Sequence, residues 1–241
     1  MNEGYFVSED ANVYYRKMGS GEMIVLLHGN RQSHRSLMKI ARILSKKYQV
    51  VLMDSRGHGN SQFGKRRLSL DLMVEDLYLL LEEIGVRRVI LFGFSDGANL
   101  AIHFAASYPN RVSRVIAVSS NVRAEGLKPL FLSGLKASMV VFRFFGKLHI
   151  PTGRQMALTD LMLRYSDISD QELSQITAPV LILSGDNDIV RKKHSLEMGH
   201  LIKNAEVKII KGAGHLTMFS KTEMYMAIIS GFLGVQLYEK T

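Results

Sequence analysis

The chain has 241 residues, of which 46% are hydrophobic and 22% charged, a composition typical of one soluble globular domain with a sizeable core. It contains no cysteine, which excludes disulfides, thiolate catalysis and cysteine-ligated zinc. The net charge of +9 comes from scattered basic clusters without a nucleic-acid-binding motif, so we expect no nucleic-acid partner, although the positive field favours anionic substrates or surfaces.

The N-terminal stretch shows no basic region followed by the apolar core of a signal peptide. We also see no apolar run that is long enough to cross a bilayer. We therefore expect a cytoplasmic protein that does not insert into membranes.

Strands and helices alternate along the first half of the chain. A polar turn between two short strands predicts an antiparallel hairpin at 5–7 and 13–15. Apolar runs without polar alternation predict buried strands at 23–27, 49–53, 89–93 and 112–118. Helices are predicted at 35–46, from a capping serine at 69 to about 84, and at 97–108. This alternation is typical of a mainly parallel sheet with helices on both faces.

The alternation stops after Asn121 and resumes at Pro179. The sequence between them is helical in character and partly apolar, and Ser169 and Glu172 form a capping box that opens a short helix. After Pro179 we predict strands at 180–183 and 207–210, and helices at 194–202 and 222–233. The sequence thus predicts a core made of residues 1–120 and 179–241, with a helical lid inserted at 121–178.

Ser95 lies at the centre of the run Gly93-Phe94-Ser95-Asp96-Gly97, between a predicted strand and a predicted helix. Such a sharp turn strains the backbone, and the two glycines leave room for it because they carry no Cβ. The turn holds the serine hydroxyl clear of its neighbours and brings the backbone N–H of Asp96 beside it. The pattern predicts a nucleophile and half of an oxyanion hole.

A serine hydroxyl needs a base to take its proton and an acid to orient that base. His215 follows the last predicted strand in a glycine-rich loop, and Asp188 comes just past the strand before it. Loops after the carboxyl ends of parallel strands meet at one edge of the sheet. The order Ser95, Asp188, His215 is the one expected with a nucleophile elbow. Asp186 is the main rival acid, but it comes too early if the strand ends at Gly185.

The other histidines are weaker candidates for the base. His58 lies in a glycine-rich loop where a structural hydrogen bond is the usual role, and His103 falls within the helix after the elbow. His194 and His200 are expected on a surface helix.

The run His28-Gly29-Asn30 ends a neighbouring predicted strand, and the backbone N–H of Asn30 is the expected second oxyanion donor. We expect the substrate to contact side chains at this edge and in the lid, namely Asn30, Phe94, Leu127, Phe131, Leu135 and Met139. The alternative is that the lid residues only pack the lid onto the core.

Taken together, these signatures resemble the α/β-hydrolase fold family along nearly the whole chain. The resemblance also rests on the runs at 54–61 and 185–188. It implies a three-layer fold with a mostly parallel eight-stranded sheet, a Ser95–His215–Asp188 triad, an oxyanion hole from Asn30 and Asp96, and a helical lid between strands six and seven. Family members that are dehalogenases or epoxide hydrolases carry aspartate where Ser95 stands, so these activities are disfavoured. Asn30 also replaces the bulky aromatic residue that is frequent in related esterases, which would reshape the acyl pocket.

The sequence therefore predicts a carboxylesterase-like serine hydrolase that acts on an ester-like carbonyl of a small molecule through an acyl-enzyme. No organic cofactor or metal is implied, and we expect a monomer or homodimer. Two alternatives stay open. The same residues can run C–C bond hydrolysis, lyase chemistry or perhydrolysis, and some proteins of this fold are ligand receptors or signalling partners.

Overall fold

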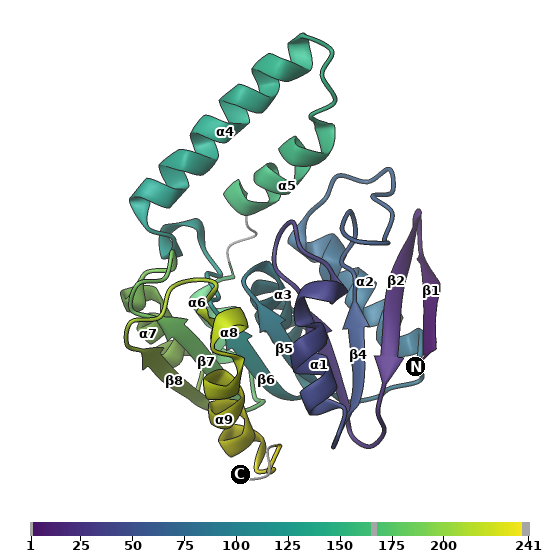
Figure 1. The fold of residues 1–241 in the computed structure, drawn as a ribbon, viewed down its shortest axis with the longest axis vertical. Coiled ribbons are helices and arrows are strands. Elements are labelled where there is room, and N and C mark those ends of the chain that lie inside the picture. The colour runs from purple at the N-terminus through teal and green to yellow at the C-terminus, as the bar shows by residue number, and fades with distance from the viewer. Residues whose placement is uncertain (1, 165–167, 238–241) are drawn as a thin grey trace.

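A computed structural model describes residues 2–164 and 168–237, whose strands form one eight-stranded sheet (Figure 1). The strand order across this sheet is β1-β2-β4-β3-β5-β6-β7-β8. The strands are β1 (Asn2–Ser8), β2 (Ala11–Met18), β3 (Met23–Leu27), β4 (Gln49–Met53), β5 (Val89–Phe94), β6 (Val112–Val118), β7 (Val180–Gly185) and β8 (Ala205–Ile210). β2 pairs antiparallel with β1 and β4, and the other neighbours are parallel. The predicted fold, a mainly parallel sheet with an N-terminal hairpin, is confirmed.

Helices cover both faces of the sheet and enclose two hydrophobic cores. In β3, Val25 and Leu27 belong to the core that includes α2 (Leu70–Glu83) and α3 (Asp96–Ser107). Their neighbours Ile24 and Leu26 belong to the opposite core, with α1 (Met38–Leu44) and α9 (Thr222–Leu233) (Figure 1). The core also contains α6 (Asp170–Ser174), α7 (Lys192–Leu201) and α8 (Thr217–Ser220). The central strands are continuously apolar because both of their faces are buried.

A helical insertion between β6 and β7 contains α4 (Pro129–Lys147) and α5 (Gly153–Leu163), and α4 extends away from the core (Figure 1). The helical character predicted for this region is confirmed, whereas its boundaries at 121 and 178 stay a prediction. The expectation that no apolar run is long enough to cross a bilayer is wrong. α4 has 19 residues, a mean hydropathy of 1.2 and only 6% of its apolar window buried. Length and composition alone do not make α4 a membrane span, because helices of soluble proteins pass the same test.

The helix predicted at 35–46 begins later than expected. The chain first makes a 3₁₀ turn, η1 (His34–Leu37), and α1 starts only at Met38. The backbone N–H of His34 donates to the Asp54 carboxylate at 2.5 Å, and the imidazole Nδ1 binds the same carboxylate at 2.9 Å. These two bonds hold the chain against the end of β4 before the helix can begin.

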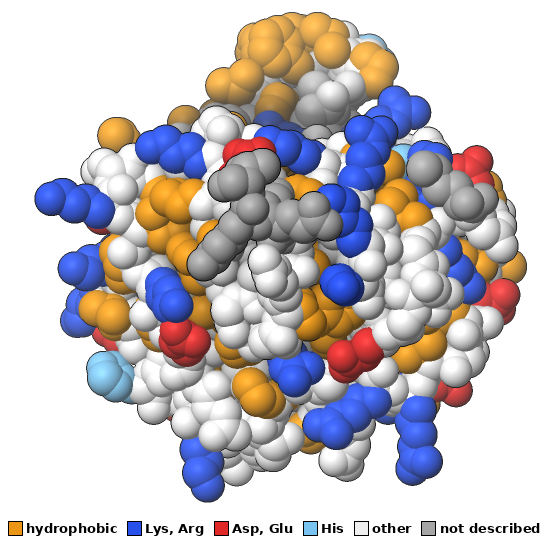
Figure 2. All heavy atoms as spheres, turned by 60° about the horizontal axis from the view of Figure 1, so that its bottom comes forward, with side chains coloured by type: hydrophobic (Ala, Val, Ile, Leu, Met, Phe, Trp, Pro, Cys, Tyr) orange, Lys and Arg blue, Asp and Glu red, His pale blue; other side chains and the backbone are white. Residues whose placement is uncertain are grey.

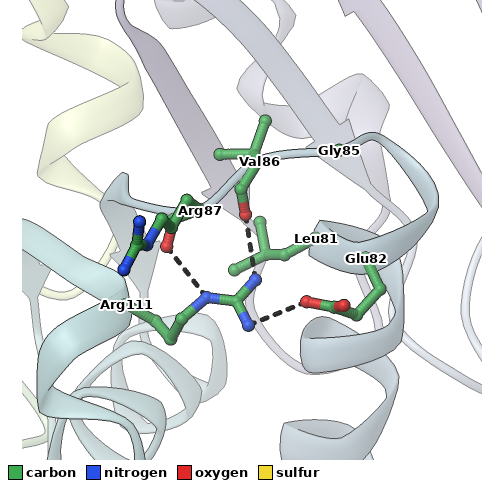
Figure 3. A pocket seen from close by; sticks show the side chains of 6 residues that line it. All are labelled: Leu81, Glu82, Gly85, Val86, Arg87 and Arg111. Atoms are coloured by element: carbon green, nitrogen blue, oxygen red, sulfur yellow. Dashed lines mark hydrogen bonds and ion pairs between the residues drawn. The ribbon is translucent and has the colours of Figure 1, made fainter.

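A shallow surface pocket of about 350 Å³ lies between the end of α2 and the start of β6. The Arg111 guanidinium crosses it and donates to the backbone carbonyls of Val86 and Arg87 at 2.9 and 2.8 Å (Figure 3). The same group forms an ion pair with Glu82 at 2.8 Å. Arg111 therefore ties the α2–β5 loop to the chain before β6, which is a structural role.

A buried ion pair connects the loop after β4 to α2. Arg56 and Asp76 are both 0% exposed and form two hydrogen bonds, from Nη2 at 2.7 Å and from Nε at 3.0 Å. Arg56 also donates to Asp10 at 2.5 Å and to the backbone carbonyl of Ser8 at 3.2 Å. The charge of Arg56 is thus fully paired inside the core.

The structure also contains several buried histidines whose ionisation is suppressed, among them His28, His58 and His194. Burial lowers the pKa of both His58 and His194 to about 4. Nε2 of each ring is buried without a hydrogen-bond partner in the described part of the chain, so both rings are neutral. His194 corrects our expectation of a surface position, since it is 5% exposed and packs against Gly126, whereas His200 on the same helix is exposed.

We expect the free energy of unfolding to fall as the pH drops from about 6.5 to about 4. In this window the imidazoles of His58 and His194 take up protons in the unfolded chain but not in the folded one. The stability that they contribute above pH 6.5 is therefore lost as the pH falls toward their folded pKa of about 4. Each histidine contributes about 3 kcal/mol to the loss. Urea unfolding near pH 7 and near pH 4.5 measures it. His194→Leu should flatten the profile and His200→Gln should not, whereas equal stability at both pH values would contradict the assignment.

Candidate active site

Ser95 occupies a strained turn between the last residue of β5 and the first of α3. Its φ is 52° and its ψ −118°, in the half of conformational space that side chains other than glycine rarely enter. A Cβ on Gly93 would lie 2.2 Å from the Gly97 carbonyl oxygen, and one on Gly97 would lie 2.1 Å from that of Leu27. Both glycines are therefore required by close backbone contacts, as the sequence predicts.

His215 connects Ser95 to Asp188. Its Nδ1 lies 2.7 Å from the Asp188 carboxylate, and its Nε2 lies 3.2 Å from the Ser95 hydroxyl. A carboxylate only accepts, so the imidazole proton sits on Nδ1 and the Nε2 lone pair faces the serine. The three residues follow β5, β7 and β8, and the sheet brings them together at its carboxyl edge.

The Asp188 carboxylate is fully buried and held by three donors. Besides His215, Ser119 Oγ donates at 2.5 Å and the backbone N–H of Val190 at 3.2 Å. Burial pushes the pKa of Asp188 upward, but the hydrogen bonds from these donors outweigh burial and leave the pKa below its usual value. Asp188 therefore stays ionised beside the imidazole.

The rival acid Asp186 has a different partner. Its carboxylate accepts a hydrogen bond from the backbone N–H of Gly212 at 2.8 Å and so braces the loop that leads to His215. Sequence reasoning missed Ser119, the second side-chain donor to Asp188. Ser119 has a positive φ of 58°, an unusual backbone conformation that marks the residue in the structure but cannot be seen in the sequence.

A cleft of about 420 Å³ opens beside Ser95 and is mainly apolar. It is lined by Gly29, Asn30, Arg31, Gln32, Phe94, Ser95, Phe131, Leu135, Met162, Ile189, His215 and Leu216. Four of the six residues expected to contact the substrate are in this lining, namely Asn30, Phe94, Phe131 and Leu135. Their contact with a substrate stays a prediction.

The other two expected residues are not in the lining. Leu127 is 3% exposed and pairs with Val190 in a β-bridge at the base of the insertion. Met139 is the most buried residue of α4, at 7% exposed. Sequence reasoning missed Arg31, Met162 and four further lining residues, because periodicity does not tell which loop or helix folds over the cleft.

The Asn30 side chain is fixed between the elbow and the insertion. Its amide nitrogen donates to the Asp96 carboxylate at 2.8 Å and to the Leu158 carbonyl at 3.0 Å. Asp96 is the first residue of α3, where backbone N–H groups have no acceptor within the helix. The expectation that Asn30 and Asp96 donate to an oxyanion stays a prediction, and the link between their side chains keeps the two residues adjacent.

Comparisons with known proteins agree with this architecture. Residues 22–149 match the family model described as alpha/beta hydrolase fold. A 2-hydroxy-6-oxononadienedioate/2-hydroxy-6-oxononatrienedioate hydrolase of Pseudomonas putida is 26% identical, over 93% of this chain and 92% of its own. An α/β hydrolase enzyme from a Medee basin deep-sea metagenome library superposes with a TM-score of 0.85 at 22% identity, covering 99% of this chain and 100% of its own. A thermophilic esterase from Thermogutta terrifontis gives 0.78 at 22% identity, covering 97% and 98%. With more than half of its length matched by the family model, the chain belongs to the α/β hydrolase fold family.

Proposed function

We propose that the protein is a serine hydrolase that cleaves ester bonds of small molecules. The observation that carries this proposal is the hydrogen-bonded chain from Asp188 through His215 to Ser95. In it, a buried ionised carboxylate fixes the imidazole tautomer, and the free imidazole nitrogen faces a serine hydroxyl at the mouth of a cleft.

The reaction then proceeds in two halves. Ser95 Oγ attacks the carbonyl carbon while His215 Nε2 takes the hydroxyl proton, and the backbone N–H groups of Asn30 and Asp96 bind the oxyanion. The carbon–oxygen bond to the alcohol breaks and the alcohol leaves with the proton from His215. Water, deprotonated by His215, attacks the acyl-enzyme, and Ser95 recovers its proton as the acid departs.

The volume and the lining of the cleft favour a substrate with a small, largely apolar acyl group. The cleft volume of about 420 Å³ lies within the range typical of small-molecule pockets. Phe131 and Leu135 from α4 and Met162 from α5 form part of its wall, so the insertion contributes to substrate binding and acts as the lid.

A second candidate substrate class is an acidic 2-hydroxy-6-oxo compound, cleaved at a C–C bond by the same three residues. The Pseudomonas putida relative is named for hydrolysis of such a dicarboxylate. Arg31 favours this class, since it is one of the residues that line the cleft and its guanidinium donates to Thr159 at 2.8 Å and lies 5.8 Å from the centre of the Phe142 ring. A carboxylate in the cleft would meet this cation.

Labelling with a fluorophosphonate, followed by peptide mass spectrometry, tests the proposed nucleophile. We expect one adduct, on Ser95, with labelling at least about 100-fold slower in His215→Gln because the hydroxyl then keeps its proton. p-Nitrophenyl esters of graded acyl length, assayed beside a 2-hydroxy-6-oxo dicarboxylate, separate the two substrate classes. Folded protein that takes up no label, or takes it up elsewhere, would overturn the proposal.

A further inference from the structure

The outward face of α4 exposes a stripe of large apolar side chains. Leu130, Val141, Phe144 and Leu148 are 87%, 47%, 59% and 55% exposed. At about 100° per residue, these four side chains and that of Ala137 share one side of a helix. Figure 2 shows hydrophobic side chains gathered on the part of the molecule that projects at the top of the view. Folded proteins rarely leave so continuous an apolar surface without a partner.

A stripe of positive charge runs beside the apolar one. Lys136, Arg143 and Lys147 are exposed and lie seven and four residues apart, which places them on one line along the helix. The sequence from 126 to 159 contains no aspartate or glutamate. The outer surface of α4 thus carries apolar and cationic side chains and no acidic one.

We propose that this outer surface of α4 docks on the surface of an anionic lipid bilayer. An amphipathic helix with phenylalanine and leucine on one face and lysine and arginine along its border lies in the headgroup region, with its apolar face toward the acyl chains and its cations beside lipid phosphates. The helix lies on the membrane and does not span it, because its opposite face supplies Phe131 and Leu135 to the cleft.

Charge and shape favour a lipid bilayer over a second copy of the chain as the partner of this surface. Two α4 surfaces brought face to face would oppose like charges along their full length, without an acidic residue of the segment to offset them. α4 also extends away from the core (Figure 1), so the core does not block its approach to a flat bilayer. If the proposed function holds, docking brings the cleft next to membrane-dissolved esters, but the binding itself does not depend on catalysis.

Flotation with phosphatidylcholine vesicles, with and without about one third phosphatidylglycerol, tests the proposal. We expect the native chain to float with the anionic vesicles and to be released by high salt. The triple variant Lys136→Gln, Arg143→Gln, Lys147→Gln should lower the partition coefficient about 100-fold, at about fivefold per charge. Phe144→Ser with Leu148→Ser should lower it at least about tenfold.

Matched controls change exposed residues on other parts of the surface. The triple variant Lys46→Gln, Lys47→Gln, Lys203→Gln removes the same net charge, and Leu196→Ser removes an exposed leucine of α7. We expect less than about a fivefold effect from either, and all variants should keep the native melting temperature because the changed side chains are exposed.

Three outcomes would overturn the proposal: no flotation of the native chain, equal loss in the control variants, or concentration-dependent dimers in light scattering that Phe144→Ser abolishes. Ser95→Ala should float like the native chain, which separates this result from the proposed hydrolase activity.

Discussion

Ser95→Ala is expected to lower kcat for ester hydrolysis by about 10⁵- to 10⁶-fold while the protein stays folded. The substitution removes the only atom that can form the acyl-enzyme, and His215 and Asp188 alone retain no nucleophile. The residual rate comes from the oxyanion donors and from substrate binding. Alanine fits the space of the serine, and Ser95 is 7% exposed, so circular dichroism and the melting temperature should be close to native. Initial rates with a p-nitrophenyl ester give the measurement.

Ser195→Ala is the matched control for this experiment. Ser195 is a buried serine of α7 whose hydroxyl has no hydrogen-bond partner within the described ranges. We expect its kcat to stay within about twofold of native, because α7 carries none of the three reacting groups. A Ser95→Ala protein with more than about 1% of native kcat would contradict the nucleophile assignment.

Arg56→Met is expected to destabilise the fold by about 3–5 kcal/mol. Methionine fills much of the arginine volume but leaves the Asp76 carboxylate 0% exposed and without its cation. Ser8 Oγ still donates to that carboxylate, yet one hydroxyl cannot offset a buried charge. Such a loss is a large part of the stability of a typical domain. The shift in the urea midpoint measures it.

The double variant Arg56→Met, Asp76→Leu separates the ion pair from the packing around it. Replacing both charges with apolar groups removes the unpaired carboxylate, so stability should recover most of the loss. A double variant that is less stable than Arg56→Met would show that the pair itself, rather than the cost of an isolated charge, stabilises the structure.

The sequence predicted the parallel sheet and the three residues that meet at its edge, because both depend on local patterns. Buried strands of a parallel sheet are continuous apolar runs, and β3, β4 and β6 have the predicted bounds. The elbow is marked by glycines that its close backbone contacts require, and the loop positions of Asp188 and His215 follow from the strand ends.

The wall of the cleft could not be predicted in the same way. Leu127 and Phe131 are both apolar residues of the insertion, yet Leu127 pairs with Val190 and Phe131 lines the cleft. The difference depends on how the insertion folds back over the core, which is a long-range property. Ser119 was missed for the same reason, since its bond to Asp188 joins residues 69 positions apart.

The insertion leaves and rejoins the core at almost the same point. The Arg123 guanidinium, which precedes α4, donates to the Ile168 carbonyl at 3.0 and 2.9 Å and forms an ion pair with Asp170, the first residue of α6. A helical segment whose ends lie equally close together is therefore expected to replace α4 and α5 without disturbing the strands. The helical insertion should therefore be exchangeable as one unit. A chimaera that carries the insertion of another α/β hydrolase at this junction should keep the arrangement of Ser95, His215 and Asp188. Its substrate preference should become that of the protein that supplied the insertion.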